Sequence, residues 1–229
     1  MRGQSLQESV QQLIQMHEAW GPKTSTPGAS LTLREFDRSG PIVRYDLAAS
    51  GVPKDVVYSL IAWPVTQKAP IVSMQGVTLD DSGIAVCAGI PGTCSGDGPN
   101  DPIHVTLQPI PGEPARLGLV SADGKVRALA KIVPIPLRGE DRGCSVGATL
   151  LTPGAEVVLI EGAGFPPNSD MTLSSDSGQE HQGGKGHIDE DGKYTSAILP
   201  YRQGATRGVT KVVLESAKCA PSLSFRWGR

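Results

Sequence analysis

The chain has 229 residues, a formal net charge of −2 and only 4% aromatic residues, with 28 glycines and 19 prolines. This length allows one large domain or two domains of ordinary size. Frequent Gly and Pro exclude long helices beyond the first twenty residues and favour short strands joined by tight turns. Acidic and basic residues are interspersed, so the clustered basic surface of a nucleic-acid-binding protein is absent. No apolar run approaches the length of a membrane span.

The first predicted element is a short amphipathic α-helix over residues 5–20. Ser5 and Glu8 have the spacing of a capping box, and Gly21-Pro22 ends the pattern. Five residues share one helical face: Leu6, Val10, Leu13, Ile14 and His17. A lone helix of this length is unstable in water, so this face needs a surface to bury it. Two interpretations stay open, which are packing on the chain's own first β-domain and docking on a neighbouring subunit.

The helix and a following linker make up residues 1–27, and a first β-sandwich domain is predicted over residues 28–138. Short apolar runs alternate there with turn residues, as strands of a sandwich do. Asp123-Gly124 is the strongest hairpin signal, because both residue types tolerate the backbone angles of a tight turn. Prolines and the charged residues 138–142 then mark the boundary between two domains.

A second β-sandwich domain is predicted over residues 143–229. About seven short strands follow one another there, separated by turns rich in Pro, Gly and Asp. Asp191-Gly192 provides a second tight turn of the same kind as Asp123-Gly124. The fold class expected for the whole chain is therefore all-β, with two tandem β-sandwiches behind the short helix.

Four cysteines at positions 87, 94, 144 and 219 allow three disulfide pairings. Cys87 and Cys94 are close in sequence and enclose Gly and Pro, which favours a small local loop. Cys144 and Cys219 then remain for the second domain; four reduced thiols are the alternative. Disulfides imply an oxidising compartment, so we expect an extracellular, cell-surface or periplasmic protein. Because residues 1–4 lead into no signal peptide, we expect that an export signal has been removed; a cytosolic protein with free thiols is the alternative.

Part of the second domain resembles a known group of domains. Residues 162–168 read Gly-Ala-Gly-Phe-Pro-Pro-Asn, residues 189–194 read Asp-Glu-Asp-Gly-Lys-Tyr, and Leu199-Pro200 follows. This pattern resembles bacterial extracellular immunoglobulin-like β-sandwich domains over residues 144–228. The resemblance implies a secreted or surface-exposed module that serves as a spacer, adhesion or assembly unit. It provides no catalytic residues to transfer, and residues 30–137 match it only in their general strand pattern. The expected fold is two tandem immunoglobulin-like sandwiches behind the short helix.

No catalytic motif occurs in the sequence, so we expect no enzymatic activity and no cofactor. The strongest candidate for a calcium site is a set of three residues with oxygen ligands, Asp97, Asn100 and Asp101. The alternative, which we favour, is that these residues form a solvent-exposed loop without a metal ion. His181, His187 and Asp189 form a weaker transition-metal candidate, because residues 182–186 between the histidines look like a mobile loop. Tyr201 is the aromatic residue expected to be most exposed, and one ring does not make a carbohydrate platform.

We therefore predict a non-enzymatic secreted or surface protein with a structural or interaction role. It is expected to bind protein, in particular another copy of itself, through the N-terminal helix or an open sheet edge. It is expected to bind no nucleic acid and to span no membrane. The alternative is a ligand-binding accessory module, for a glycan or calcium, that belongs to an exported system.

Overall fold

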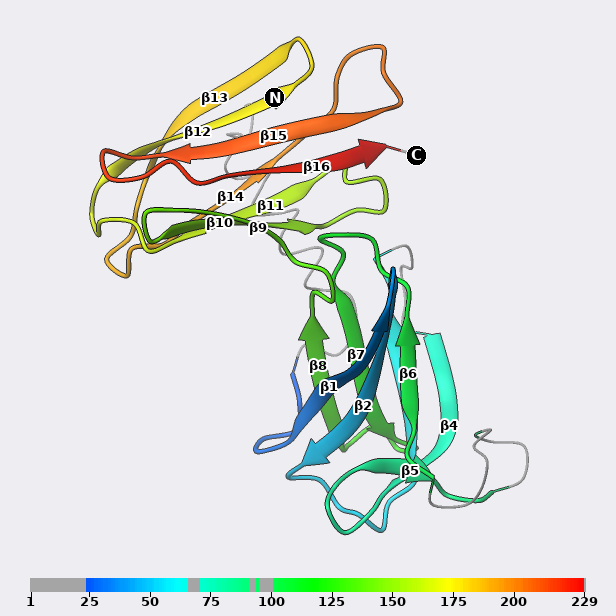
Figure 1. The fold of residues 1–229 in the computed structure, drawn as a ribbon. Coiled ribbons are helices and arrows are strands. Elements are labelled where there is room, and N and C mark those ends of the chain that lie inside the picture. The colour runs from blue at the N-terminus through cyan, green and yellow to red at the C-terminus, as the bar shows by residue number, and fades with distance from the viewer. Residues whose placement is uncertain (1–23, 66–70, 91–93, 95–100, 229) are drawn as a thin grey trace, which may run out of the picture. The chain divides into compact units, whose positions relative to one another are not determined.

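The computed structural model describes residues 24–65, 71–90, 94 and 101–228, and the structural statements below concern these residues. They are all-β, with strands joined by turns and loops (Figure 1). They divide into two compact units. The N-terminal unit comprises the described residues of 24–110 and 114–134, and the C-terminal unit comprises 111–113 and 135–228. The predicted helix over residues 5–20 lies outside the described residues.

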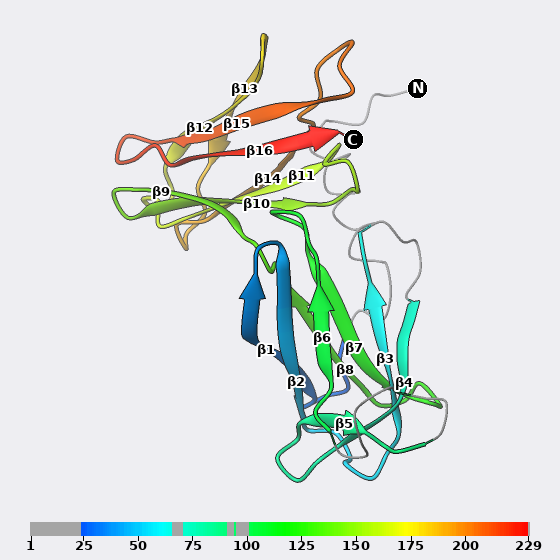
Figure 2. The same cartoon turned by 45° about the vertical axis from the view of Figure 1, so that its right-hand side comes forward.

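The N-terminal unit contains two antiparallel sheets, with strand orders β1-β2-β6 and β5-β4-β3-β7-β8 (Figure 2). Its strands are β1 (Ser30–Ser39), β2 (Ile42–Ser50), β3 (Tyr58–Trp63), β4 (Ile71–Leu79), β5 (Ala85–Cys87), β6 (His104–Leu107), β7 (Ala115–Ser121) and β8 (Arg127–Ile132). In β2 every second residue is buried, from Val43 to Ala49, which is the pattern of a strand with one face on a core. The core between the two sheets includes Leu47, Tyr58, Leu60 and Leu119.

The C-terminal unit is built from two four-stranded antiparallel sheets, with strand orders β14-β11-β10-β9 and β13-β12-β15-β16. Its strands are β9 (Leu137–Asp141), β10 (Cys144–Leu150), β11 (Val158–Ala163), β12 (Asp170–Ser177), β13 (Glu180–His187), β14 (Tyr194–Ile198), β15 (Arg207–Glu215) and β16 (Ser222–Gly228). Both sheets contribute to one core, which includes Ile160, Phe165, Val212 and Trp227. Each unit is therefore sandwich-like, with its own apolar interior.

Two segments differ from what the sequence predicted. The charged residues 138–141, which the sequence predicts to mark a boundary between domains, belong to the edge strand β9, where Arg138 and Glu140 stay exposed. The glycine-rich residues 182–186, which the sequence predicts to form a mobile loop, form the middle of β13. In both segments the backbone pairs with a neighbouring strand although the side chains give no apolar alternation.

The predicted tight turn at Asp123-Gly124 is confirmed. It joins β7 to β8, Gly124 has φ +70°, and Gly124 N donates to Ser121 O. Gly192 likewise has a positive φ, and a Cβ there would lie 2.5 Å from Phe165 O. Glycine is required at both positions, because other residues rarely adopt this backbone conformation.

Two disulfides connect the cysteines in the pairs that the sequence favoured. Cys87 and Cys94 have a Cα–Cα distance of 5.9 Å, and Cys144 and Cys219 one of 6.3 Å. Both distances lie within the ordinary range for disulfides. Two disulfides indicate an oxidising, non-cytoplasmic environment. No helix among the described residues is long and apolar enough to cross a membrane.

Candidate interaction site

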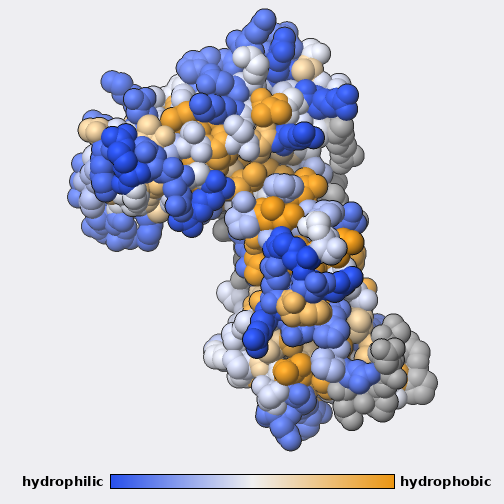
Figure 3. Space-filling model, viewed as in Figure 1, coloured by the Kyte–Doolittle hydropathy of each residue, from blue (hydrophilic) through white to orange (hydrophobic). Residues whose placement is uncertain are grey.

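The strand β13 forms one edge of its sheet and has an unusual composition. Its sequence is Glu-His-Gln-Gly-Gly-Lys-Gly-His, with no aliphatic side chain, and all but two of its residues are exposed. It pairs with β12 over eight consecutive residues without a bulge. Because β13 has a neighbour on one side only, every second residue directs its backbone N–H and C=O away from the sheet. The surface over β12 and β13 is largely hydrophilic (Figure 3).

The turn end of the β12–β13 hairpin is fixed by buried hydroxyl groups. Ser177 Oγ donates to Pro200 O at 2.8 Å, and Thr210 Oγ1 lies 3.2 Å from the same carbonyl oxygen. The two hydroxyls also contact each other, and both residues are buried. Across the hairpin turn, Glu180 Oε1 accepts a hydrogen bond from Gln203 N at 2.8 Å. These contacts hold β13 in place relative to the rest of the unit.

Each end of β13 carries a histidine that contacts an aspartate of β12. His181 Nδ1 contacts Asp176 Oδ1, and His187 Nδ1 lies 3.4 Å from Asp170 Oδ1. All four side chains are substantially exposed, so these pairs contribute little to stability. Six residues of extended strand separate the two imidazoles by about 20 Å, which is too far for one metal ion.

The other residues of the weaker metal candidate also have structural roles. Asp189 Oδ1 accepts hydrogen bonds from Asp191 N and Lys193 N, which stabilises the turn before β14. The described residues include no group of three or more His, Cys, Asp or Glu placed to hold a metal ion. Of the calcium candidates, Asp97 and Asn100 lie outside the described residues; Asp101 O accepts a hydrogen bond from Cys87 N.

The opposite side of the C-terminal unit, where β9 meets β16, is closed. A Cβ at Gly139 would lie only 1.8 Å from Ser222 O, so the two backbones are in direct contact. Ala220 N donates to Asp141 Oδ2 at 2.7 Å. This bond, helped by the Arg142 guanidinium, holds the pKa of the Asp141 carboxyl below its ordinary value. The unit therefore offers β13 rather than β9 as an accessible backbone edge.

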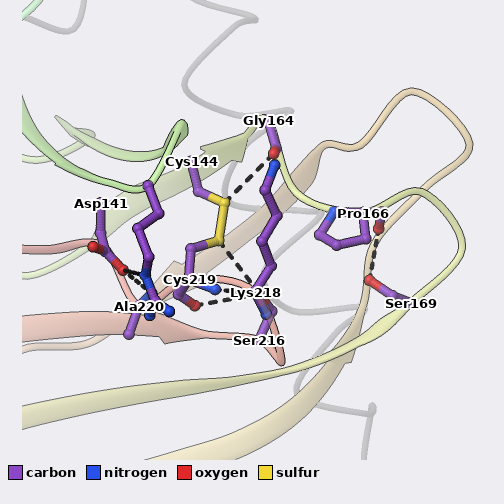
Figure 4. The surroundings of a disulfide bond; sticks show 10 residues. Asp141, Cys144, Gly164, Pro166, Ser169, Ser216, Lys218, Cys219 and Ala220 are labelled. Atoms are coloured by element: carbon purple, nitrogen blue, oxygen red, sulfur yellow. Dashed lines mark hydrogen bonds and ion pairs between the residues drawn. A yellow bond between two sulfur atoms is a disulfide. The ribbon is translucent and has the colours of Figure 1, made fainter.

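The Cys144–Cys219 disulfide lies beside this closed side (Figure 4). Cys144 begins β10 in one sheet, and Cys219 lies in the turn before β16 in the other, so the bond links the two sheets. Ser216 Oγ lies 3.4 Å from Cys219 Sγ, and Gly164 O lies 3.4 Å from Cys144 Sγ. Both cysteines are almost fully buried, which protects the bond from thiols in solution.

The structure also brings together Phe36, His104 and Asp46 on the N-terminal unit, a group that sequence reasoning did not identify. A bulge between Glu35 and Asp37 displaces Phe36, whose ring centroid lies 4.7 Å from that of His104. His104 Nδ1 lies 2.8 Å from Asp46 Oδ1. Sequence gives no signal for this contact, because it depends on the bulge. One exposed ring and one exposed ion pair enclose no ligand, so we assign no site to it.

The remaining predicted residues fall in several places. Tyr201 is 53% exposed, as expected, whereas Tyr45, Tyr58 and Trp227 are buried. The predicted helix residues Leu6, Val10, Leu13, Ile14 and His17 lie outside the described residues.

The signal that could have identified β13 from the sequence is the near-symmetry of residues 181–187, which read His-Gln-Gly-Gly-Lys-Gly-His.

Comparison of the sequence with protein-family models and with curated proteins finds no match.

Proposed function

We propose that this chain is a non-enzymatic, exported interaction protein of the bacterial surface or periplasm that associates with a second copy of itself through β13. The observation that carries the proposal is the open β13 edge, a regular strand of eight residues in which every second residue directs its backbone N–H and C=O away from the sheet. Such an edge favours pairing with a further strand, by the same hydrogen bonds that join strands within a sheet. No further chemistry is required of the side chains.

Two features support the immunoglobulin-like character of the C-terminal unit. It consists of two four-stranded antiparallel sheets around one core, and a disulfide links one sheet to the other. Modules of this architecture commonly serve as spacers or assembly units on cell surfaces. The two disulfides favour the same exported location.

A second copy is the proposed partner because β13 is nearly symmetric about Gly184. In an antiparallel pair with Gly184 opposite Gly184 of the second copy, Gln182 faces Gly186 and Lys185 faces Gly183. Each long side chain then lies opposite a glycine, which leaves room for both. Residues of each pair also point to the same face of the sheet, as antiparallel pairing requires. The contact is isologous and closes as a two-fold dimer.

The test is a charge at the centre of the strand. A Cβ at Gly184 meets nothing within 4 Å, so Gly184→Glu is tolerated within one copy. In the dimer two carboxylates lie opposite each other and repel. We expect light scattering across a wide concentration range to show a dimer for the original chain and a monomer for Gly184→Glu.

The matched control is Ser224→Glu, which adds the same charge to an exposed position of β16, at the other edge of the sheet. It is expected to dimerise like the original chain. A monomeric original chain at every concentration, or a Gly184→Glu variant that still dimerises, refutes association through β13.

A further inference from the structure

The five-stranded sheet of the N-terminal unit has an apolar outer face. Along β3 and β7 the residues that point into the core alternate with residues that point away from it. Ile61, Trp63 and Leu129 gather on the outward side over Gly118, where a Cβ would lie 2.6 Å from Leu129 Cδ2 and 3.4 Å from Trp63 Cζ3. These three side chains belong to neither of the two hydrophobic cores among the described residues.

Trp63 exposes only 3% of its surface, although it lies on this outer face. Neighbouring strands flank such an indole, but a sheet leaves its outward side open. The burial of Trp63 therefore indicates that further chain covers the face. Trp63 Nε1 and Arg127 Nε are buried there, and no described residue accepts their hydrogen bonds. The covering layer must supply polar acceptors as well as apolar side chains.

The described chain begins beside this face. Thr26 N donates to Arg127 O at 2.8 Å, and Leu129 N donates to Ser25 Oγ at 3.0 Å. Residues 25–26 therefore run along β8, the edge strand of the five-stranded sheet. From β8 to β3 is two strand spacings, about 10 Å. Four extended residues reach about 13 Å, so residues 21–24 are long enough to lead the preceding chain onto the face.

Residues 5–20 have the composition that this face requires. Their apolar stripe continues from Leu13 and Ile14 to Trp20 at helical spacing. Residues 3–22 contain five glutamines and the acids Glu8 and Glu18, with no Lys or Arg. The outer face contributes cations from β7 and β8: Arg116, Arg127 and Lys131. A helix of 16 residues is about 24 Å long, which matches the width of five strands.

We propose that residues 5–20 form an amphipathic helix that packs on the outer face of the five-stranded sheet within the same chain, with Leu13, Ile14 and Trp20 over Trp63. The helix completes the N-terminal unit as a third layer. Its glutamines and glutamates accept hydrogen bonds from the buried N–H groups of Trp63 and Arg127. The proposal is independent of the association through β13.

The test uses the full chain labelled with 5-fluorotryptophan. The ¹⁹F resonance of Trp63 is assigned with Trp63→Phe, and its exposure is measured as broadening by a soluble paramagnetic agent. We expect Trp63 to be protected in the original chain and strongly broadened in Leu13→Asp/Ile14→Asp, and after deletion of residues 1–22. The control Gln12→Asp/Gln15→Asp adds the same charge to the polar side of the helix and is expected to leave Trp63 protected.

Two outcomes overturn the proposal. Trp63 that stays protected in both Leu13→Asp/Ile14→Asp and the deletion shows that another part of the molecule covers it. Protection that is lost when the original chain is diluted shows that the cover belongs to a second copy rather than to the same chain. Melting curves serve as a second measurement: the two helix variants are expected to lower the melting temperature of the N-terminal unit, and Gln12→Asp/Gln15→Asp is not.

Discussion

The two units of the molecule differ in what their sheets present to the outside. The outer face of the sheet β13-β12-β15-β16 carries polar residues such as Thr172, Lys211 and Glu215. The outer face of the five-stranded sheet carries Ile61, Trp63 and Leu129 instead. A sheet with a polar outer face is complete in a two-layer fold, whereas one with an apolar outer face needs a third layer. The C-terminal unit is therefore complete as it stands, and the N-terminal unit needs further chain.

The two units also differ in how strongly their disulfides constrain the chain. The Cys144–Cys219 bond links two sheets across 75 residues of sequence, whereas the Cys87–Cys94 bond closes a loop of 7. A cross-link removes more freedom from the unfolded chain when it closes a longer loop. Covalent stabilisation is thus concentrated in the C-terminal unit, and packing against added chain is expected to stabilise the N-terminal unit.

Removal of each disulfide tests this difference most strongly. Chain entropy predicts that Cys144→Ala/Cys219→Ala lowers the free energy of unfolding of the C-terminal unit by about 4.5 kcal/mol. The same estimate for Cys87→Ala/Cys94→Ala in the N-terminal unit is about 2.4 kcal/mol. Denaturant titration under oxidising conditions measures both. Equal losses in the two variants would contradict the assignment of the main covalent constraint to the C-terminal unit.

The closed side of the C-terminal unit provides a smaller test. Gly139→Ala places a methyl group 1.8 Å from Ser222 O, so β9 and β16 must separate. We expect a loss of about 2–3 kcal/mol in the free energy of unfolding, as for an overpacked core. Gly147→Ala is the matched control, because its Cβ meets nothing closer than 3.8 Å. Similar stabilities of the two variants would show that the close approach of β9 and β16 is dispensable.

Acid provides the mildest test, and it acts on one carboxyl in each unit. Hydrogen bonds from the Ser82 hydroxyl and from Ile84 N hold the pKa of the Asp80 carboxyl below its ordinary value, and the Ala220 N–H does the same for the pKa of Asp141. A lowered folded-state pKa gives stability that is present above the unfolded pKa and is lost as the pH falls through the folded value. Melting temperatures should therefore fall below pH 4, and less steeply in Asp80→Asn and Asp141→Asn. Unchanged slopes in both variants would argue against these bonds.

Much of the fold could be predicted from local chemistry. The alternation of β2 and the turn at Asp123-Gly124 depend on residues that are adjacent in sequence, so the pattern is visible there. The strand β13 could not be predicted in this way, because Gly183, Gly184 and Lys185 have low strand propensity and extend only through pairing with β12. The same holds for β9, whose charged side chains concealed an edge strand.

The candidate surfaces were harder to predict than the strands. Trp63 lies in a strand whose residues are almost all apolar, so periodicity does not tell which face each one occupies. It is buried, but it lies on the outer face of its sheet and outside the core between the two sheets. The β13 edge depends on strand order, which is set by contacts between distant parts of the chain.

The disulfide between Cys144 and Cys219 also determines how the protein responds to mechanical load. When the chain is pulled from its two ends, force passes directly through the sulfur–sulfur bond from β10 to the turn before β16. Once the strands outside the loop, β9 and β16, have peeled away, the chain between the cysteines bears no tension. At about 3.4 Å per residue, the disulfide prevents the 75-residue segment from adding about 250 Å to the length of the stretched chain. A protein exposed to shear would in this way keep β13 folded and in place while its flanking segments stretch.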